Sequence, residues 1–178
     1  MAHFLDGFNG VTMFPESHWS RLQVTVHSYT DAAPIGFGLV YGSKWLYGPF
    51  PPSWRKFNIL CLEAYPVMLM FEIFKSNLAN KKIILHIDNE ALVTALNKQT
   101  VDHPPTMVLI RHIVLLALKH NIIFKAEHVA GVCNTLADPL SRLQINTFRQ
   151  RAKEQELVIE DTPTQIPDHL LPGTYKLT

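Results

Sequence analysis

The pattern of hydrophobic and polar positions divides residues 22–50 into three strand-like runs. β-Branched and aromatic residues dominate 22–31 (LQVTVHSYTD), 35–42 (IGFGLVYG) and 44–50 (KWLYGPF). Gly42 and Ser43 form a two-residue hairpin signal between the last two runs. The pattern therefore predicts three antiparallel strands in succession.

The rest of the chain alternates helices with two further strands. The segment 58–80 is long enough for a helix that begins at the cap Asn58 and kinks at Pro66. Residues 81–88 (KKIILHID) form a continuous apolar run, which is typical of a central strand covered on both faces. The remaining segments predict helices over 89–98, 104–121 and 139–157, and a strand over 122–131.

The resulting order, βββαβααβα, predicts an α/β fold with a five-stranded mixed sheet. Three antiparallel strands come first, two parallel strands with helical crossovers follow, and helices flank the sheet. We expect one folded domain over residues 22–148. An N-terminal linker, 1–21, precedes it, and a helix extension with a Pro-rich C-terminal tail, 149–178, follows it.

Composition narrows the classes of function. The chain has 178 residues, 47% of them hydrophobic, and a net charge of +1, so no overall basic field holds a polyanion. Its two cysteines are too few for a disulfide framework, which favours a reducing compartment. The apolar runs are too short to span a membrane, and the N-terminus does not have the pattern of a secretory signal. We expect an intracellular protein of the cytoplasm or nucleus that is neither secreted nor membrane-bound.

Four carboxylates fall at informative places on this predicted frame. Asp31 ends the first strand, Glu63 lies in the first helix, Asp88 ends the fourth strand, and Asp138 opens the last helix. Taken singly, Asp31 is also a good turn residue, and Asp88 and Asp138 are good helix N-caps. Both interpretations of these three residues stay open.

Glu63 is harder to explain as a structural residue. Its helical neighbours Leu60, Val67 and Met70 are apolar, so the side chain lies within the stripe that should be buried. A buried carboxylate costs several kcal/mol unless it is paired or bound to a cation, and no Lys or Arg lies within a helical turn. A hard divalent cation held by Asp31, Glu63 and Asp88 resolves the conflict, and oxygen-only ligands favour Mg²⁺ or Mn²⁺ over zinc.

Four segments also resemble a known family. They are YTDAAPIGFGLVYG, LEAYP, HIDNEALV and HVAGVCNTLADPLSR, and the resemblance as a whole covers roughly residues 5–148. In order and spacing they resemble the ribonuclease H domain of reverse transcriptases, most closely that of DIRS-like tyrosine-recombinase retrotransposons. The resemblance implies a ribonuclease H-like fold over the domain 22–148.

The resemblance also implies a site and a reaction. Asp31, Glu63, Asp88 and Asp138 would be the four catalytic acids and would bind two Mg²⁺ or Mn²⁺ ions. The reaction would be two-metal hydrolysis of the RNA strand of an RNA–DNA hybrid. Asn89 and Asn134 would contact the sugars of the hybrid, although Asn89 can equally be a helix cap and Asn134 a loop residue. A reverse transcriptase polymerase domain would be the partner that supplies local substrate concentration.

Two departures from the family pattern are visible. The loop AGVCNTLAD is short and carries Val132 and Cys133 where related enzymes have a histidine. His128 lies earlier, on the strand itself, and is interpreted as a strand or core residue. The connection KQTVDHPPT has no room for the basic helix that some family members use to grip the hybrid, so we expect weak binding by this domain alone.

Two other functions remain open. The first is a catalytically inactive ribonuclease H-like relic that binds nucleic acid or protein. The second is a DNA-strand transferase or exonuclease on the same fold, which is disfavoured because transposase-type sites place their glutamate last in the chain.

Overall fold

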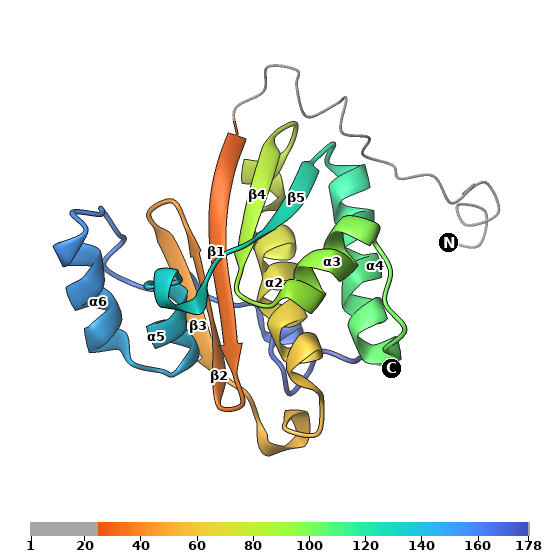
Figure 1. Cartoon of the computed structure of the whole chain (residues 1–178), viewed down its shortest axis with the longest axis horizontal. Helices are drawn as coiled ribbons and strands as arrows, with labels where there is room; N and C mark the ends of the chain where they lie inside the picture. The colour runs from red at the N-terminus through yellow and green to blue at the C-terminus, as the bar shows by residue number, and fades with distance from the viewer. Residues whose placement is uncertain (1–24, 178) are drawn as a thin grey trace.

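Five strands form one mixed sheet in the order β3-β2-β1-β4-β5. The structure, a computed structural model, describes residues 25–177. β1 pairs antiparallel with β2 and parallel with β4, β3 is antiparallel to β2, and β5 is parallel to β4. The predicted mixed sheet is confirmed (Figure 1). The strands are β1 (Thr25–Ala33), β2 (Gly36–Tyr41), β3 (Lys44–Pro49), β4 (Lys82–Ile87) and β5 (Ile123–His128).

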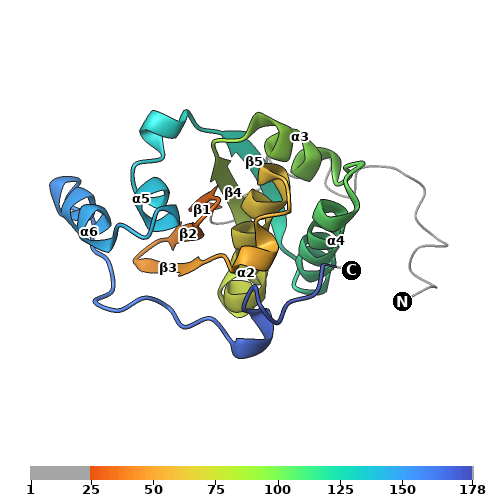
Figure 2. The ribbon, with the colours of Figure 1, turned by 90° about the horizontal axis from the view of Figure 1, so that it is seen from below.

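The main helices cover both faces of the sheet (Figure 2). One face carries α2 (Ile59–Leu78), α3 (Glu90–Lys98) and α4 (Pro104–Lys119), and the other carries α5 (Ala137–Ser141) and α6 (Ile145–Glu154). Three short 3₁₀ turns, η2 (Pro52–Trp54), η3 (Gly131–Cys133) and η4 (Asp168–Leu170), lie in the connections. Asn58 caps α2 as predicted, because its side chain accepts a hydrogen bond from the Cys61 amide at 2.9 Å. α2 continues through Pro66 to Leu78.

Two hydrophobic cores follow from the alternation of side chains along β2. Phe37 and Leu39 face the larger core, together with Tyr65 and other residues of α2. Val40 faces the smaller core under α5 and α6, which also contains Trp45 and Phe148. The sheet is therefore covered on each face by a different set of helices.

The last predicted helix, over 139–157, is wrong as a single element. α5 ends at Ser141 and α6 begins at Ile145, because Leu143 adopts a left-handed conformation with φ 60°. The break redirects the chain so that Phe148 packs on Trp45, with ring centroids 4.8 Å apart.

The C-terminal strap, residues 158–177, packs against the body of the domain. The Glu160 amide donates to the Ser43 carbonyl at 2.8 Å, and the Thr164 amide donates to the Trp45 carbonyl at 2.7 Å. Tyr65 Oη donates to the Leu170 carbonyl at 2.5 Å, and the Leu170 side chain is only 3% exposed. The strap thus covers part of the outer edge of β3, a kind of edge that proteins commonly protect from pairing with other chains.

Two further predictions concern the N-terminal linker and membrane-spanning helices. The predicted N-terminal linker, 1–21, lies outside the described residues. Within the part that is described, no helix combines the length and the apolar composition that a membrane span requires.

Candidate active site

Asp31 lies near the end of β1, at the centre of the sheet. It pairs with Gly38 of β2, so the Asp31 side chain projects from the same face as Gly38. Gly38 has no side chain, and α5 packs directly over it. A Cβ atom at Gly38 would lie 2.4 Å from Leu140 Cβ and 2.7 Å from the Ala137 carbonyl oxygen. The glycine-rich hairpin therefore lets α5 approach the strand that carries Asp31.

This close approach brings residues of α5 to Asp31. The Ser141 hydroxyl donates a short hydrogen bond to Asp31 Oδ2, and it lies 2.8 Å from the Asp138 carbonyl oxygen. Asp138 is in the first turn of α5, where the helix dipole favours a negative charge. The fourth predicted acid is thus placed beside the first.

Glu63 lies on α2, which packs on the opposite face of the sheet from α5 (Figure 2). It lies in the second turn of α2 and is only 7% exposed, as its apolar surroundings predict. Its Oε1 accepts a hydrogen bond from Asn89 Nδ2 at 3.3 Å. Its Oε2 is buried and has no hydrogen-bond partner among the described residues. One carboxylate oxygen is therefore left available for a ligand.

Asp88 directly follows β4, the parallel neighbour of β1, and is half-buried. The turn η3 crosses above it, because a Cβ atom at Gly131 would lie 3.2 Å from Asp88 Oδ2. Asp88 does not cap α3. The cap is Asn89, whose Oδ1 accepts a hydrogen bond from the Leu92 amide at 3.1 Å. The cap position of α5 is likewise Leu136 and not Asp138.

The four carboxylates are electrostatic neighbours. The pKa of Glu63 is raised from 4.5 to about 8, chiefly by burial and also by the charges of Asp88 and Asp31, while the hydrogen bond from Asn89 opposes the rise. The pKa of Asp31 is likewise raised from 3.8 to about 7, chiefly by burial and also by repulsion from Asp88 and Asp138. The Ser141 hydrogen bond and the Arg142 charge oppose this rise. At neutral pH this site therefore retains protons that ordinary carboxylates have lost.

The residues at the site fit a hard divalent cation chemically, but they are not gathered around one. Within residues 25–177, no three His, Cys, Asp or Glu side chains are placed so that they could hold a metal ion as they stand. Asp31 instead contacts Ser141, Glu63 contacts Asn89, and Asp138 contacts Arg142. The donors are all carboxylate oxygens, and the unpaired Glu63 Oε2 is the kind of group that Mg²⁺ or Mn²⁺ accepts.

The two predicted asparagines differ in position. Asn89 is half-buried at the site and holds Glu63. Asn134 is fully buried, and its Nδ2 donates to the Thr30 carbonyl at 2.9 Å. The burial of Asn134 leaves it no surface for contact with a sugar, and its observed contact instead ties the loop before α5 to β1.

His128 lies at the end of β5, opposite Ile87 of β4. Its side chain is 40% exposed, and Nδ1 lies 3.9 Å from Glu90 Oε1 on α3. It is thus a partly exposed residue on a strand face, and not part of the core. The loop that follows carries Val132, whose side chain is exposed.

Three side chains at the site were not predicted: Ser141, Arg142 and Arg151. Arg142 Nε donates to Asp138 Oδ1 at 2.8 Å, and Arg151 Nη1 lies 3.7 Å from Asp138 Oδ2. The i, i+4 spacing of Asp138 and Arg142 is a sequence signal for the first of these ion pairs. Arg151 comes from α6, and its approach depends on the break at Leu143.

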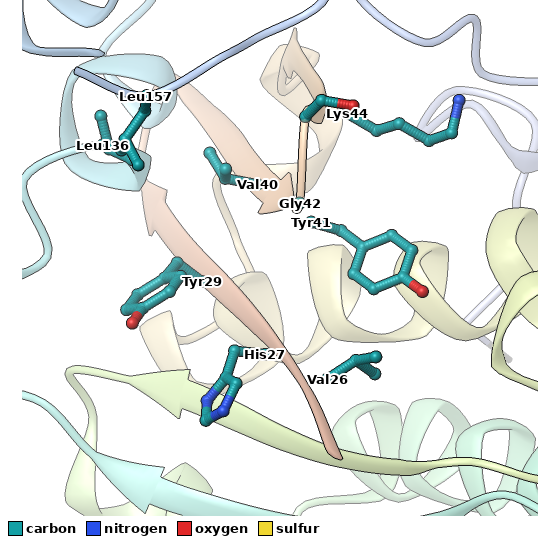
Figure 3. Close-up of a pocket in the computed structure, with 10 residues that line it drawn as sticks. Val26, His27, Tyr29, Val40, Tyr41, Gly42, Lys44, Leu136 and Leu157 are labelled. Atoms are coloured by element: carbon teal, nitrogen blue, oxygen red, sulfur yellow. The ribbon is translucent and has the colours of Figure 1, made fainter. Parts of the chain in front are cut away.

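A hollow of about 560 Å³ lies away from the carboxylates, toward the beginning of β1 (Figure 3). Val26, His27, Tyr29 and Tyr41 are among the residues that line it, and none of the four acids does. The hollow is therefore separate from the candidate active site.

Solved ribonuclease H structures share this architecture. Ribonuclease H1 from the halophilic archaeon Halobacterium salinarum NRC-1 matches with a TM-score of 0.56 at 16% identity, over 69% of this chain and 98% of that one. The N-terminal RNase H domain of rv2228c from Mycobacterium tuberculosis, solved as a fusion with maltose binding protein, matches with a TM-score of 0.55 at 19% identity, over 73% and 99%. LC11-RNase H1 in complex with an RNA/DNA hybrid matches with a TM-score of 0.52 at 15% identity, over 70% and 97%.

These matches show that the chain has the ribonuclease H fold. No protein-family model and no curated protein matches the sequence.

Proposed function

We propose that this protein is a metal-dependent endonuclease that hydrolyses the RNA strand of RNA–DNA hybrids. The observation that carries the proposal is Glu63, a buried carboxylate whose Oε2 has no hydrogen-bond partner within residues 25–177 and whose pKa is raised to about 8. Perturbed carboxylates of this kind are typical of functional sites. The ribonuclease H fold supports the choice of reaction.

The proposed metal ligands are Asp31, Glu63, Asp88 and Asp138, which would hold two Mg²⁺ or Mn²⁺ ions. Ions bound there supply activation of a water nucleophile at neutral pH and stabilisation of charge on the phosphodiester. The protein orients the ligands, because Ser141 fixes Asp31 and Asn89 fixes Glu63. Burial and repulsion raise the pKa values of Glu63 and Asp31 while no cation is bound. A bound cation would stabilise the charged carboxylates, so both residues would release protons on binding.

Asn89 is the proposed contact to the hybrid at this site. Its Oδ1 is used as the cap of α3 and one Nδ2 hydrogen points to Glu63. An amide nitrogen carries a second hydrogen, which can donate to a 2′-hydroxyl and so distinguish RNA from DNA.

The proposed context is a DIRS-like retroelement, in which the domain works beside a reverse transcriptase polymerase domain. Support comes from the order and spacing of the four motifs around Asp31, Glu63, Asp88 and Asp138. A net charge of +1 also favours a tethered domain, because tethering supplies the substrate concentration that a basic surface would otherwise provide.

A second candidate is an inactive relic of the same fold that binds nucleic acid or protein. Two observations favour it. Asp138 is engaged by two arginines, and the acids are not gathered into a preformed metal site among the described residues.

The deciding experiment is cleavage of an end-labelled RNA–DNA hybrid with and without Mn²⁺, beside single-stranded RNA and duplex DNA. We expect cleavage of the RNA strand in the hybrid only when Mn²⁺ is present. Asp31→Asn and Glu63→Gln should each lower the rate at least about a hundred-fold, because each removes a ligand carboxylate. Glu156→Gln, at an exposed position beyond α6, is the matched control. Mn²⁺ binding without any cleavage would favour the relic, and faster cleavage of duplex DNA would favour a DNA-directed enzyme.

A further inference from the structure

We propose that Arg142 is a phosphate-binding residue of the carboxylate site. While no divalent ion is bound, Arg142 forms an ion pair with Asp138. When a divalent ion binds to Asp138 instead, the Arg142 side chain turns to a phosphate of the substrate strand. This inference rests on the proposed function and names a phosphate-binding residue for it.

Asp138 has a cationic partner at each oxygen. Arg142 Nε donates to Oδ1 at 2.8 Å, and Arg151 Nη1 lies 3.7 Å from Oδ2. Arg151 is also anchored elsewhere, because it donates to the Thr135 carbonyl at 2.9 Å. Arg142 is the closer and less restrained of the two, and its side chain is 56% exposed.

The charge of Arg142 acts on more than its direct partner. The pKa of Arg142 is raised by the hydrogen bond to Asp138 and by the charges of Asp138, Asp31 and Asp88. In return, the charge of Arg142 opposes the rise in the pKa of Asp31. The guanidinium group thus offsets repulsion at the place where a divalent cation would do so.

More than half of the Arg142 side chain is exposed to solvent, so its ion pair with Asp138 is a surface one. Arg142 is the C-terminal cap of α5, and the left-handed Leu143 follows it directly. Its exposed ion pair with Asp138 changes an equilibrium by only about fivefold or less. A divalent ion on several carboxylates binds far more strongly than such a pair, so it can displace the guanidinium group.

The chemistry of a displaced Arg142 side chain suits a phosphate of the substrate strand. The planar guanidinium forms paired hydrogen bonds with phosphate oxygens, and such contacts position a nucleic-acid strand without reading its sequence. The chain as a whole carries a charge of only +1, so an arginine beside the carboxylates adds an attraction for phosphate that the overall charge does not supply.

The test compares the wild-type protein with Arg142→Ala, Arg142→Lys and Arg111→Ala. The last variant is the control, because it removes the same charge from an exposed position on α4.

Mn²⁺ binding is measured by calorimetry. Arg142→Ala should bind Mn²⁺ about three- to fivefold more tightly, because the competing cation is gone. Arg111→Ala should match the wild type.

Hybrid binding is then measured by fluorescence anisotropy over a range of NaCl concentrations. Ca²⁺ takes the place of Mn²⁺, since it accepts the same oxygen ligands, and a gel verifies that the RNA strand stays intact. Arg142→Ala should weaken hybrid binding about five- to tenfold and should lower the slope of log K against log salt by about 1. Arg142→Lys should keep the slope, because it keeps the charge.

An Mn²⁺ affinity that is unchanged or weaker in Arg142→Ala would overturn the inference, and so would an unchanged salt slope. A wild-type protein that binds Mn²⁺ and hybrid but cleaves no RNA would overturn the proposed function alone. The two failures are therefore distinguishable.

Discussion

Glu63 shows how a single side chain sets the chemistry of this molecule. Every residue from Cys61 to Phe71 is buried, so the apolar pattern of the sequence was sufficient to predict the burial of Glu63. Its hydrogen-bond partner was not predictable, because Asn89 comes from another element and serves as the cap of α3 at the same time. The same holds for Ser141, whose contact with Asp31 depends on how α5 packs.

The raised pKa values predict a stability that falls with pH. In the absence of metal, the folded state holds protons on Glu63 up to about pH 8 and on Asp31 up to about pH 7, whereas the unfolded state releases them near 4.5 and 3.8. The folded state binds more protons over this range, so the free energy of unfolding should decrease from about pH 4 to about pH 8, by a few kcal/mol.

Urea unfolding in EDTA at pH 5 and pH 9 measures this decrease. Glu63→Gln should remove a large part of it, and Glu156→Gln, which changes an exposed glutamate, should not. A wild-type protein that is equally stable at both pH values would show that folding does not raise the pKa values of these carboxylates.

At the scale of the elements, the close packing of α5 on β2 connects the fold to the site. The sequence predicted all five strands from their β-branched and apolar runs. It predicted α2 from its length and its cap, α3 from helical spacing, and α4 from the prolines that open it. It did not predict the break at Leu143, because a left-handed residue other than glycine is stabilised there by tertiary packing, above all that of Phe148 on Trp45.

Gly38→Ala tests this packing. The new Cβ would lie 2.4 Å from Leu140 Cβ and 2.9 Å from the Ser141 amide nitrogen, so α5 must move away from Asp31. We expect a loss of about 1–3 kcal/mol in the free energy of unfolding, measured by urea titration, together with reduced cleavage of hybrid. The control is Gly173→Ala, where a Cβ meets nothing within 4 Å. Equal stability of the two variants would contradict the close approach of α5.

At the scale of the whole molecule, the C-terminal strap links elements that are distant in the sequence. It runs past β3 and α2 to the side of α4, where the Tyr175 hydroxyl and His112 Nδ1 lie 2.8 Å apart (Figure 2). Its course was not predictable from the sequence, because its apolar residues have no helical or strand period and each contacts a different part of the domain. The segment 149–178 was predicted only as a helix extension with a Pro-rich tail.

The contribution of the strap is tested with two adjacent leucines. Leu170 is 3% exposed and Leu171 is 38% exposed. Leu170→Ala should lower the free energy of unfolding by about 2–4 kcal/mol through loss of buried contacts, and Leu171→Ala should lower it by less than about 1 kcal/mol. Thermal or urea unfolding of the two variants gives the comparison. Equal effects would mean that the strap does not stabilise the domain.

The proposed activity depends on one claim. The carboxylates of Asp31, Glu63, Asp88 and Asp138 bind divalent cations. Calorimetric titration of the metal-free protein with Mn²⁺ at pH 7, in two buffers of different ionisation enthalpy, tests it directly. We predict binding of up to two ions accompanied by proton release, since Glu63 and Asp31 have pKa values of about 8 and about 7 before the ions bind. The proton release should diminish in Glu63→Gln. No binding heat, or the same binding and proton release in wild-type and Glu63→Gln proteins, would contradict the account.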